Sequence, residues 1–122
     1  LNRHEIIDFI QLANKKNIKI SFIMPIPIPG FDVPRYMYNE IKYNKKIVPR
    51  ETKDYLAEYN EVKNILSKID DDNINIYDVH KFFCLESCIY SLEDGSPLFY
   101  DSSHLTLEGS KLLKPLFLQI LE

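Results

Sequence analysis

The sequence lacks the features that mark several large classes of protein. No apolar run approaches the roughly 18–20 residues that a membrane-spanning helix requires. There is no basic excess, since the formal net charge is −3, so the charge gives no sign of a nucleic-acid interface. A signal peptide is also missing. The sequence begins at Leu1, within a helix-like pattern, so we interpret it as a portion of a longer polypeptide, for which that absence says little about location.

What is present indicates a globular domain. A chain of 122 residues is long enough for one domain, or for part of one. Hydrophobic residues make up 45% of it and the mean hydropathy is −0.23, which is typical of a soluble chain with enough apolar mass for a core.

The first quarter of the chain predicts a helix followed by a strand. Asn2 and Glu5 have the spacing of a capping box, and the helix that they begin should end at the lysines of residues 14–17. Residues 18–24 alternate, with apolar side chains on both faces, as in a strand covered on two sides. The proline-rich residues 25–30 should then leave the sheet as an extended loop.

The middle of the chain continues this alternation of helix and strand. Residues 31–49 show no clean period; we expect either a loop that lines a site or an irregular excursion with a short helix. A second helix is indicated by one continuous apolar stripe, formed by Tyr55, Tyr59, Val62, Leu66 and Ile69. A second strand follows at residues 74–79. The order helix, strand, helix, strand predicts an α/β fold with a parallel sheet.

The last third predicts a hairpin and a broken helix. Asp94-Gly95 separates two short apolar arms within residues 89–100, which is a hairpin signal. The final helix should begin near Thr106 as its N-cap. Pro115 lies inside that helix and should kink or split it, because proline removes a backbone hydrogen bond.

The strongest chemical candidate is a carboxylate and an imidazole three residues apart. Asp101 and His104 lie where a short apolar run gives way to the final helix. An aspartate that accepts a hydrogen bond from Nδ1 of a histidine leaves Nε2 free to take a proton from a nucleophile. In open α/β sheets such groups gather where strands end and helices begin. The alternative is a surface loop in which Asp101 caps or pairs with His104 only for local stability.

The two cysteines leave several possibilities open. Cys84 and Cys88 could form a disulfide that closes a small loop, or they could bind zinc together with His80 and His104. No cationic cluster lies near either thiol in the sequence, which argues against a catalytic cysteine. The aspartates of residues 70–72 suggest calcium, but they lack the glycine and distal glutamate of an EF-hand loop and are interpreted as a solvated turn.

Taken together, the motifs of residues 84–109 resemble the end of an SGNH-type hydrolase domain. The narrower resemblance is to the SGNH domain fused to membrane-bound acyltransferase-3 family proteins, which O-acylate cell-surface glycans. Residues 20–29 also resemble the strand of those domains that runs into an Ile-Pro loop. The motifs are, in chain order, Cys84 with Cys88, Asp94-Gly95, Leu98-Phe99-Tyr100, Asp101 with His104, Leu105-Thr106 and Gly109.

This resemblance implies a fold and a set of roles. The fold would be a three-layer α/β/α (flavodoxin-like) domain with a mainly parallel sheet and a small hairpin near residues 89–100. His104 would be the general base and Asp101 the residue that orients it. Cys84 and Cys88 would form a disulfide. The reaction would pass through an acyl-serine intermediate and would require no metal or other cofactor.

One part of the family pattern is missing. The family's nucleophilic serine lies in a Gly-Asp-Ser block near the start of the domain, and its oxyanion donors come from that block and two later ones. None of these blocks is recognisable in this sequence. Ser102 and Ser103 cannot replace the nucleophile, because they adjoin His104 in the wrong part of the fold. We therefore expect residues 1–122 to be the C-terminal portion of a single SGNH domain, inactive in isolation.

The parent protein would then be a serine-dependent O-acyltransferase or esterase. Its substrates would be acyl esters of a surface polysaccharide, lipopolysaccharide or peptidoglycan. An N-terminal membrane acyltransferase domain would be its partner, at the extracytoplasmic or periplasmic face of a bacterial membrane. Two rival hypotheses remain, a small zinc protein and a non-catalytic glycan-binding module in which Tyr36, Tyr38 and Tyr43 present a stacking surface.

Overall fold

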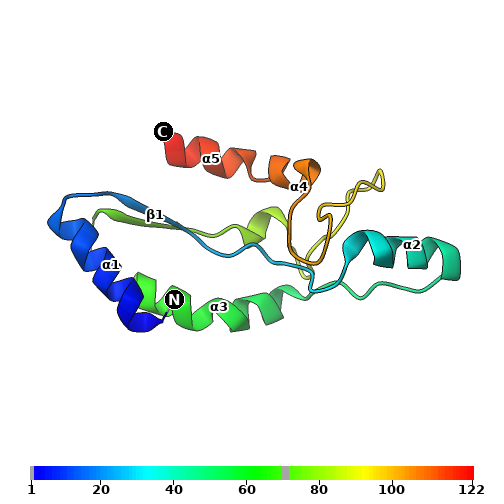
Figure 1. The fold of residues 1–122 in the computed structure, drawn as a ribbon, viewed down its shortest axis with the longest axis horizontal. Helices are drawn as coiled ribbons and strands as arrows, with labels where there is room; N and C mark the ends of the chain where they lie inside the picture. The colour runs from blue at the N-terminus through cyan, green and yellow to red at the C-terminus, as the bar shows by residue number, and fades with distance from the viewer. Residues whose placement is uncertain (1, 70–71) are drawn as a thin grey trace.

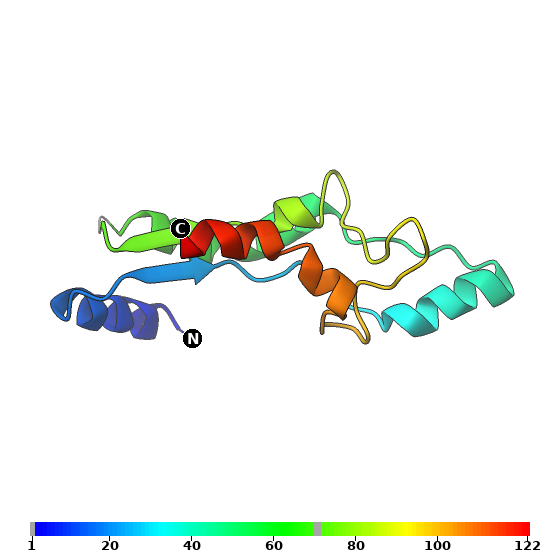
Figure 2. The same cartoon turned by 90° about the horizontal axis from the view of Figure 1, so that it is seen from above.

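The computed structural model describes residues 2–69 and 72–122, so Asp70 and Asp71 of the expected aspartate turn lie outside the described residues. The molecule is elongated, with α1 near one end and α2 at the other (Figure 2). None of the described helices is both long and apolar enough to cross a membrane. The elements are, in chain order, α1 (Arg3–Lys15), β1 (Ile20–Ile23), α2 (Val33–Tyr43), α3 (Thr52–Ser67), β2 (Ile74–Tyr77), the 3₁₀ turn η1 (His80–Phe82), α4 (Leu107–Lys111) and α5 (Lys114–Leu121).

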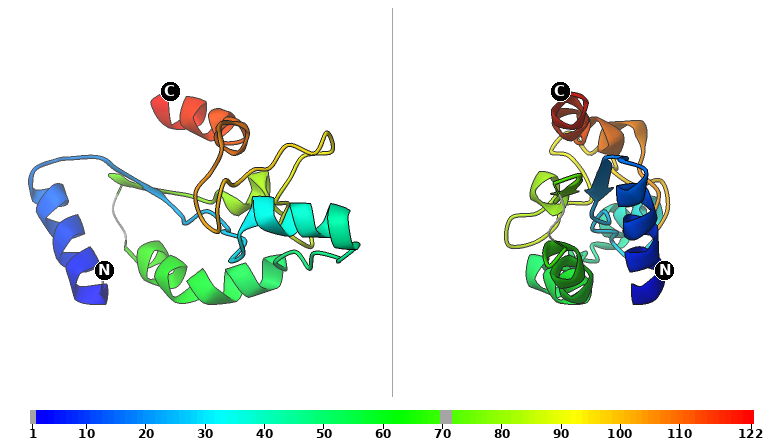
Figure 3. Two further views of the ribbon diagram at one scale, coloured as in Figure 1. Left: turned by 45° about the vertical axis from the view of Figure 1, so that its right-hand side comes forward. Right: turned by 90° about the vertical axis from the view of Figure 1, so that its left-hand side faces the viewer.

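The two described strands form a parallel sheet between helices. β1 pairs with β2 so that Ile20 lies opposite Ile74 and Ile23 lies opposite Tyr77. In Figure 1, α1 and α3 lie on one side of the strands and α5 lies on the other; the end-on view of Figure 3 shows the same three layers. The expected α/β class with a parallel sheet is therefore confirmed.

The layer that contains α1 and α3 is held by apolar side chains from both helices and both strands. We call this the sheet cluster. Its buried members are Ile10, Met24 and Leu66. α1 begins as local chemistry predicts: Asn2 accepts a hydrogen bond from the amide of Glu5, whose carboxylate accepts one from the amide of Asn2, each at 2.9 Å. This reciprocal pair is the predicted capping box.

The proline-rich segment leaves β1 as a loop, as expected, and is attached to α3. The hydroxyl of Tyr55 donates to the carbonyl oxygen of Pro25 at 2.6 Å. Burial, with a contribution from the nearby carboxylate of Asp78, raises the pKa of Tyr55 to about 12, so its hydroxyl stays protonated and remains a donor. The chain therefore leaves the sheet in a direction that is set by α3.

Residues 31–49, where the sequence shows no clean period, contain a helix of 11 residues, α2. Asp32 accepts from the amide of Arg35 at 3.2 Å and caps the helix, and Pro34 occupies its first turn. Asn44 ends it in the left-handed conformation. Val33, Met37 and Ile41 recur every four residues, and of these Val33 is buried, Met37 is partly buried against the site cluster and Ile41 is exposed. Most of the helix therefore faces solvent, and its apolar stripe is short.

The last third of the chain surrounds a second group of buried side chains, which we call the site cluster. The expected hairpin is present as a turn rather than as two strands: Ser91 bridges Pro97, and the amide of Ser96 donates to Asp94. Gly95 has a φ of 88°, which glycine adopts without strain. The buried members of the site cluster are Val33, Val79, Phe83, Cys84, Cys88, Leu98, Phe99, Leu113 and Leu116.

The final helix is divided into α4 and α5, as Pro115 predicts. The side chain of Thr106 accepts from the amide of Gly109 at 3.1 Å and donates to the carbonyl oxygen of Pro97 at 2.8 Å. A Cβ atom on Gly109 would collide with the carbonyl oxygen of Leu98. The start of α4 therefore packs against the backbone of Leu98 only because residue 109 has no side chain.

Candidate active site

The segment that carries Asp101 and His104 is a tight loop, closed at its base. Phe99 forms an antiparallel bridge with Leu105, and the amide of Tyr100 donates to the carbonyl oxygen of His104 at 3.0 Å. Phe99 is fully buried, so one side of the base is anchored in the site cluster. We call residues 100–104 the dyad loop.

Asp101 is held by three hydrogen bonds from its own loop. One carboxylate oxygen, Oδ1, accepts from the amide of His104 at 2.7 Å and from the amide of Ser103 at 2.8 Å. The other, Oδ2, lies 2.7 Å from Nδ1 of His104. The hydrogen bonds from these two amides, His104 first, hold the pKa of Asp101 below its ordinary value, and the imidazole contact adds to the effect. The carboxylate is therefore ionised at neutral pH and oriented toward the imidazole.

The imidazole of His104 presents its other nitrogen to solvent. The Nδ1 contact with Asp101 selects the tautomer that carries its proton on Nδ1 and leaves a lone pair on Nε2. None of the hydrogen bonds within residues 2–69 and 72–122 involves Nε2, and 66% of the side chain is exposed. The ring of Tyr100 stacks on the imidazole, with 5.5 Å between ring centroids. The imidazole is thus positioned from two sides, with Nε2 accessible.

The neighbouring serine is placed beside the wrong nitrogen for a nucleophile. The hydroxyl of Ser103 lies 3.4 Å from Nδ1 of His104, the nitrogen that Asp101 already engages. A general base must lie within hydrogen-bond reach of the proton that it abstracts, and the base here is Nε2. This geometry agrees with the sequence argument that Ser103 is not the nucleophile.

The dyad loop is also attached to the start of α2, a connection that sequence patterns did not reveal. The amide of Val33 donates to the carbonyl oxygen of Asp101 at 3.4 Å, and the amide of Gly30 donates to that of Ser102 at 3.3 Å. Gly30 follows the last proline of the proline-rich segment and has a φ of 79°, a value that glycine adopts without strain. The loop that follows β1 therefore places the start of α2 beside the dyad loop.

Cys84 and Cys88 are joined by a disulfide in the structure, the pairing that the resemblance implies. Neither sulfur is then the thiolate that zinc requires, and His80, the third residue of the hypothetical zinc set, instead packs against Tyr55 with 5.4 Å between ring centroids. The segment that precedes α3 holds the disulfide loop: the amide of Cys88 donates to the carbonyl oxygen of Arg50 at 2.8 Å. The zinc hypothesis is therefore wrong for this disulfide-bonded form.

Comparison with known proteins identifies the family. A family model described as "SGNH domain (fused to AT3 domains)" matches residues 2–119. Comparisons with curated proteins and with solved structures give no significant match. The match spans nearly the whole chain and includes the dyad loop, the disulfide loop and both strands. The chain therefore belongs to the SGNH domain family whose members are fused to AT3 acyltransferase domains.

Proposed function

We propose that Asp101 and His104 are the proton-handling pair of a serine-dependent O-acyltransferase or esterase. The observation that carries this proposal is the 2.7 Å contact between Nδ1 of His104 and a carboxylate that two backbone amides hold in place. Such a contact fixes the tautomer and stabilises the imidazolium that forms when Nε2 accepts a proton. Membership of the SGNH family supports a hydrolase or acyltransferase chemistry for this pair.

The reaction has two steps. In the first, Nε2 of His104 takes the serine proton while the serine oxygen attacks the acyl carbon, and the proton then passes to the oxygen of the departing alcohol. In the second, Nε2 takes a proton from an acceptor hydroxyl, or from water, which attacks the acyl-serine, and returns that proton to the serine. Asp101 stays ionised throughout and stabilises the imidazolium in both steps.

The serine in this proposal lies outside residues 1–122. Support comes from the absence of a recognisable Gly-Asp-Ser block in the sequence and from the position of Ser103 beside Nδ1 rather than Nε2. The chain is then the C-terminal portion of one SGNH domain. By itself it contributes an oriented base without a nucleophile or an oxyanion hole, and we expect it to have no esterase activity.

The substrates in this proposal are acyl esters of a cell-surface glycan, which is a polysaccharide, lipopolysaccharide or peptidoglycan. The fusion of this domain type to AT3 domains supports a membrane acyltransferase domain as its partner. The domain would work at the extracytoplasmic or periplasmic face of a bacterial membrane, where such glycans are found.

The experiment compares two histidine variants of the complete protein. We expect His104→Ala to lower acyl transfer by about 10³-fold or more, because the serine loses its base. His4→Ala, on the exposed face of α1, is the matched control and should retain full activity. A fluorophosphonate probe should label one serine outside residues 1–122, and labelling should disappear in His104→Ala. Wild-type turnover in His104→Ala would refute the proposal, and labelling of a serine within the chain would refute the location of the nucleophile.

A further inference from the structure

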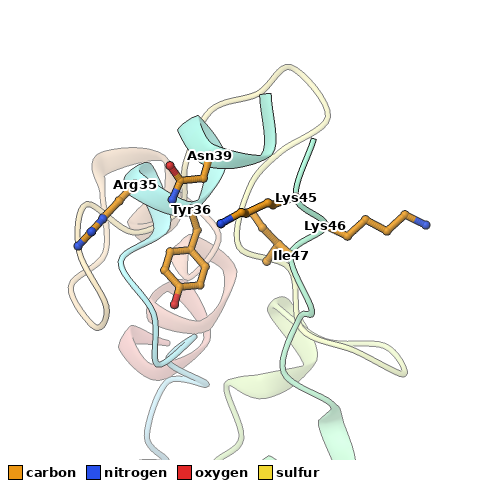
Figure 4. Close-up of a pocket in the computed structure, with 6 residues that line it drawn as sticks. All are labelled: Arg35, Tyr36, Asn39, Lys45, Lys46 and Ile47. Carbon is orange, nitrogen blue, oxygen red and sulfur yellow. The ribbon is translucent and has the colours of Figure 1, made fainter. Parts of the chain in front are cut away.

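A surface pocket of about 410 Å³ lies between α2 and the segment that follows it (Figure 4). Its wall combines positive charge, an amide, an aromatic ring and one aliphatic side chain, and includes no carboxylate. The lining residues are Arg35, Tyr36, Asn39, Lys45, Lys46 and Ile47. The pocket is separate from Asp101 and His104, and the proposed reaction assigns it no role.

The two lysines are brought back alongside α2 by a tight reversal of the chain. Asn44 ends the helix with a φ of 53°, and the amide of Ile47 donates to the carboxylate of Glu40 at 3.3 Å. Lys45 extends toward Asn39, whereas Lys46 extends outward, as Figure 4 shows. The same hydrogen bond occupies the nearest carboxylate of the helix, that of Glu40.

The charge of this region is opposite to that of the whole chain. Residues 33–48 carry four cationic side chains and one carboxylate, although the chain as a whole has a net charge of −3. Within the described part of the chain, none of the ion pairs includes Arg35, Lys45 or Lys46. A concave surface lined by unpaired charges of one sign attracts ligands of the other sign.

The ring of Tyr36, which forms the aromatic wall of the pocket, is held in place by contacts with other aromatic rings. Tyr36 stacks on Phe31 with 4.8 Å between ring centroids and an interplanar angle of 16°, and Phe31 meets Tyr90 edge-on at 5.7 Å. Phe31 and Tyr90 pack against the site cluster, whereas 46% of Tyr36 is exposed. A rigid, half-exposed ring with a polar tip provides an apolar face beside hydrogen-bonding groups. This combination suits a sugar ring better than a bare inorganic anion.

We propose that this pocket binds a carboxylated sugar unit of an anionic glycan. Lys45 and the amide of Asn39 engage the carboxylate, and Tyr36 with Ile47 contacts the sugar ring. This inference rests on the proposed function for its meaning, because it names an acidic glycan as the substrate class. The amide of Val33 donates to the carbonyl oxygen of Asp101, and the pocket-lining residues of α2 begin two residues after Val33. They therefore lie about 3–9 Å from Val33 along the helix axis. A bound oligosaccharide can therefore reach from the pocket toward the dyad loop.

The test is a binding titration of the complete protein with three probes. Tetragalacturonate should bind saturably and more weakly as salt is added, whereas neutral maltotetraose and inorganic phosphate should bind at least about tenfold more weakly.

Asn39→Asp, which changes one amide to a carboxylate of the same shape, should weaken tetragalacturonate binding by about tenfold or more. Lys45→Gln should have a similar effect, and Lys46→Gln a smaller one because that side chain extends outward. Lys19→Gln, exposed and distant in sequence, is the matched control and should leave binding unchanged.

Each contrary outcome overturns a stated part of this inference. Equal binding of maltotetraose would refute the role of charge, and equal binding of phosphate would refute the role of the sugar ring. Unchanged binding in both Asn39→Asp and Lys45→Gln would refute the site itself. His104→Ala separates this inference from the proposed function, because it should retain tetragalacturonate binding while losing acyl transfer. Retained transfer with intact binding in that variant would refute the proposed function alone.

Discussion

The two ends of the molecule bury apolar side chains to different extents. One end carries the dyad loop, and the other carries the layer that contains α1 and α3. The site cluster has a continuous buried interior, with Phe99 and Leu98 fully covered, and a disulfide within it. The sheet cluster has a smaller buried interior, formed by Ile10, Met24 and Leu66. The deeper burial thus lies under loops rather than under the regular sheet.

This difference indicates what each region has to achieve. Strands and helices satisfy their own backbone hydrogen bonds, so the sheet layer needs little more than one apolar face from each element. The dyad loop and the disulfide loop lack that regular pairing. The geometry of these loops depends on buried side chains such as Phe99, on the disulfide, and on hydrogen bonds that the amides of Val33 and Gly30 donate. The position of the dyad loop therefore depends on the site cluster, whereas the Asp101–His104 contact itself is made within the loop.

The largest expected difference in stability is between core truncations in the two clusters. We expect Phe99→Ala to lower the free energy of unfolding by about 3–5 kcal/mol, because a fully buried ring beside Phe83 leaves a cavity. Met24→Ala, in the sheet cluster, should cost about 2–3 kcal/mol, because the small cluster can close around the gap. Urea denaturation measures both changes. A larger loss for Met24→Ala would reverse the comparison.

Removal of the disulfide should affect only the site end. The double substitution of Cys84→Ser and Cys88→Ser should lower the free energy of unfolding by about 2 kcal/mol, as expected for a bridge that closes a short loop. Amide hydrogen exchange should accelerate at position 88, whose amide donates to the carbonyl oxygen of Arg50, and remain unchanged in β1 and β2. Faster exchange throughout the sheet would show that the two ends do not behave as separate regions.

A smaller comparison is between the cap of α4 at one end and the cap of α1 at the other. Thr106→Ala removes a bond from the amide of Gly109 and a bond to Pro97, so we expect a loss of about 1–2 kcal/mol. Asn2→Ala removes the cap of α1 and should cost about 0.5–1 kcal/mol. Thr106→Ser keeps both bonds and is the matched control. Equal losses for Thr106→Ala and Asn2→Ala in thermal unfolding would contradict the expected order.

The smallest expected effect is an acid-dependent loss of stability at the dyad loop. The folded-state pKa of Asp101 lies below the ordinary value of 3.8, because the amides of His104 and Ser103 stabilise the charged form. Its contribution to stability is therefore complete above about pH 4 and is lost as the pH falls through the lowered folded-state pKa. Asp101→Asn should remove this part of the pH dependence, as measured by unfolding at a series of pH values between neutral and acid. An unchanged acid profile would show that the amide bonds do not discriminate between the two protonation states.

Local sequence signals predicted much of the chain correctly. The capping box of Asn2 and Glu5, the cap at Thr106 and the break at Pro115 all depend on residues within four positions of one another. Both strands were located because alternating apolar residues indicate their burial, although β1 and β2 are each shorter than predicted. The hairpin near Asp94 was predicted with more strand structure than it has, since Pro97 cannot donate to a ladder.

The features that the sequence did not reveal lie in and beside α2, where the contacts join residues five or seven positions apart but follow no repeating pattern. α2 was expected only as an alternative to a loop, because its apolar stripe of Val33, Met37 and Ile41 is short and lies among charged and tyrosine side chains. The pocket beside it depends on the reversal at Asn44 and on the bond between Glu40 and Ile47. The stack of Tyr36 on Phe31 gives no periodic pattern along the chain.

The amino-acid sequence by itself determined which residues could form the proton-handling pair, because Asp101 and His104 are close enough in the chain for one short loop to join them. It also determined the family, through motifs that lie close together in the chain. Only the tertiary structure decided where that loop points and what lies beside it, because the amides of Gly30 and Val33 reach it from about 70 residues away. Local chemistry can specify a pair of side chains, but packing between distant segments specifies the surface on which they act.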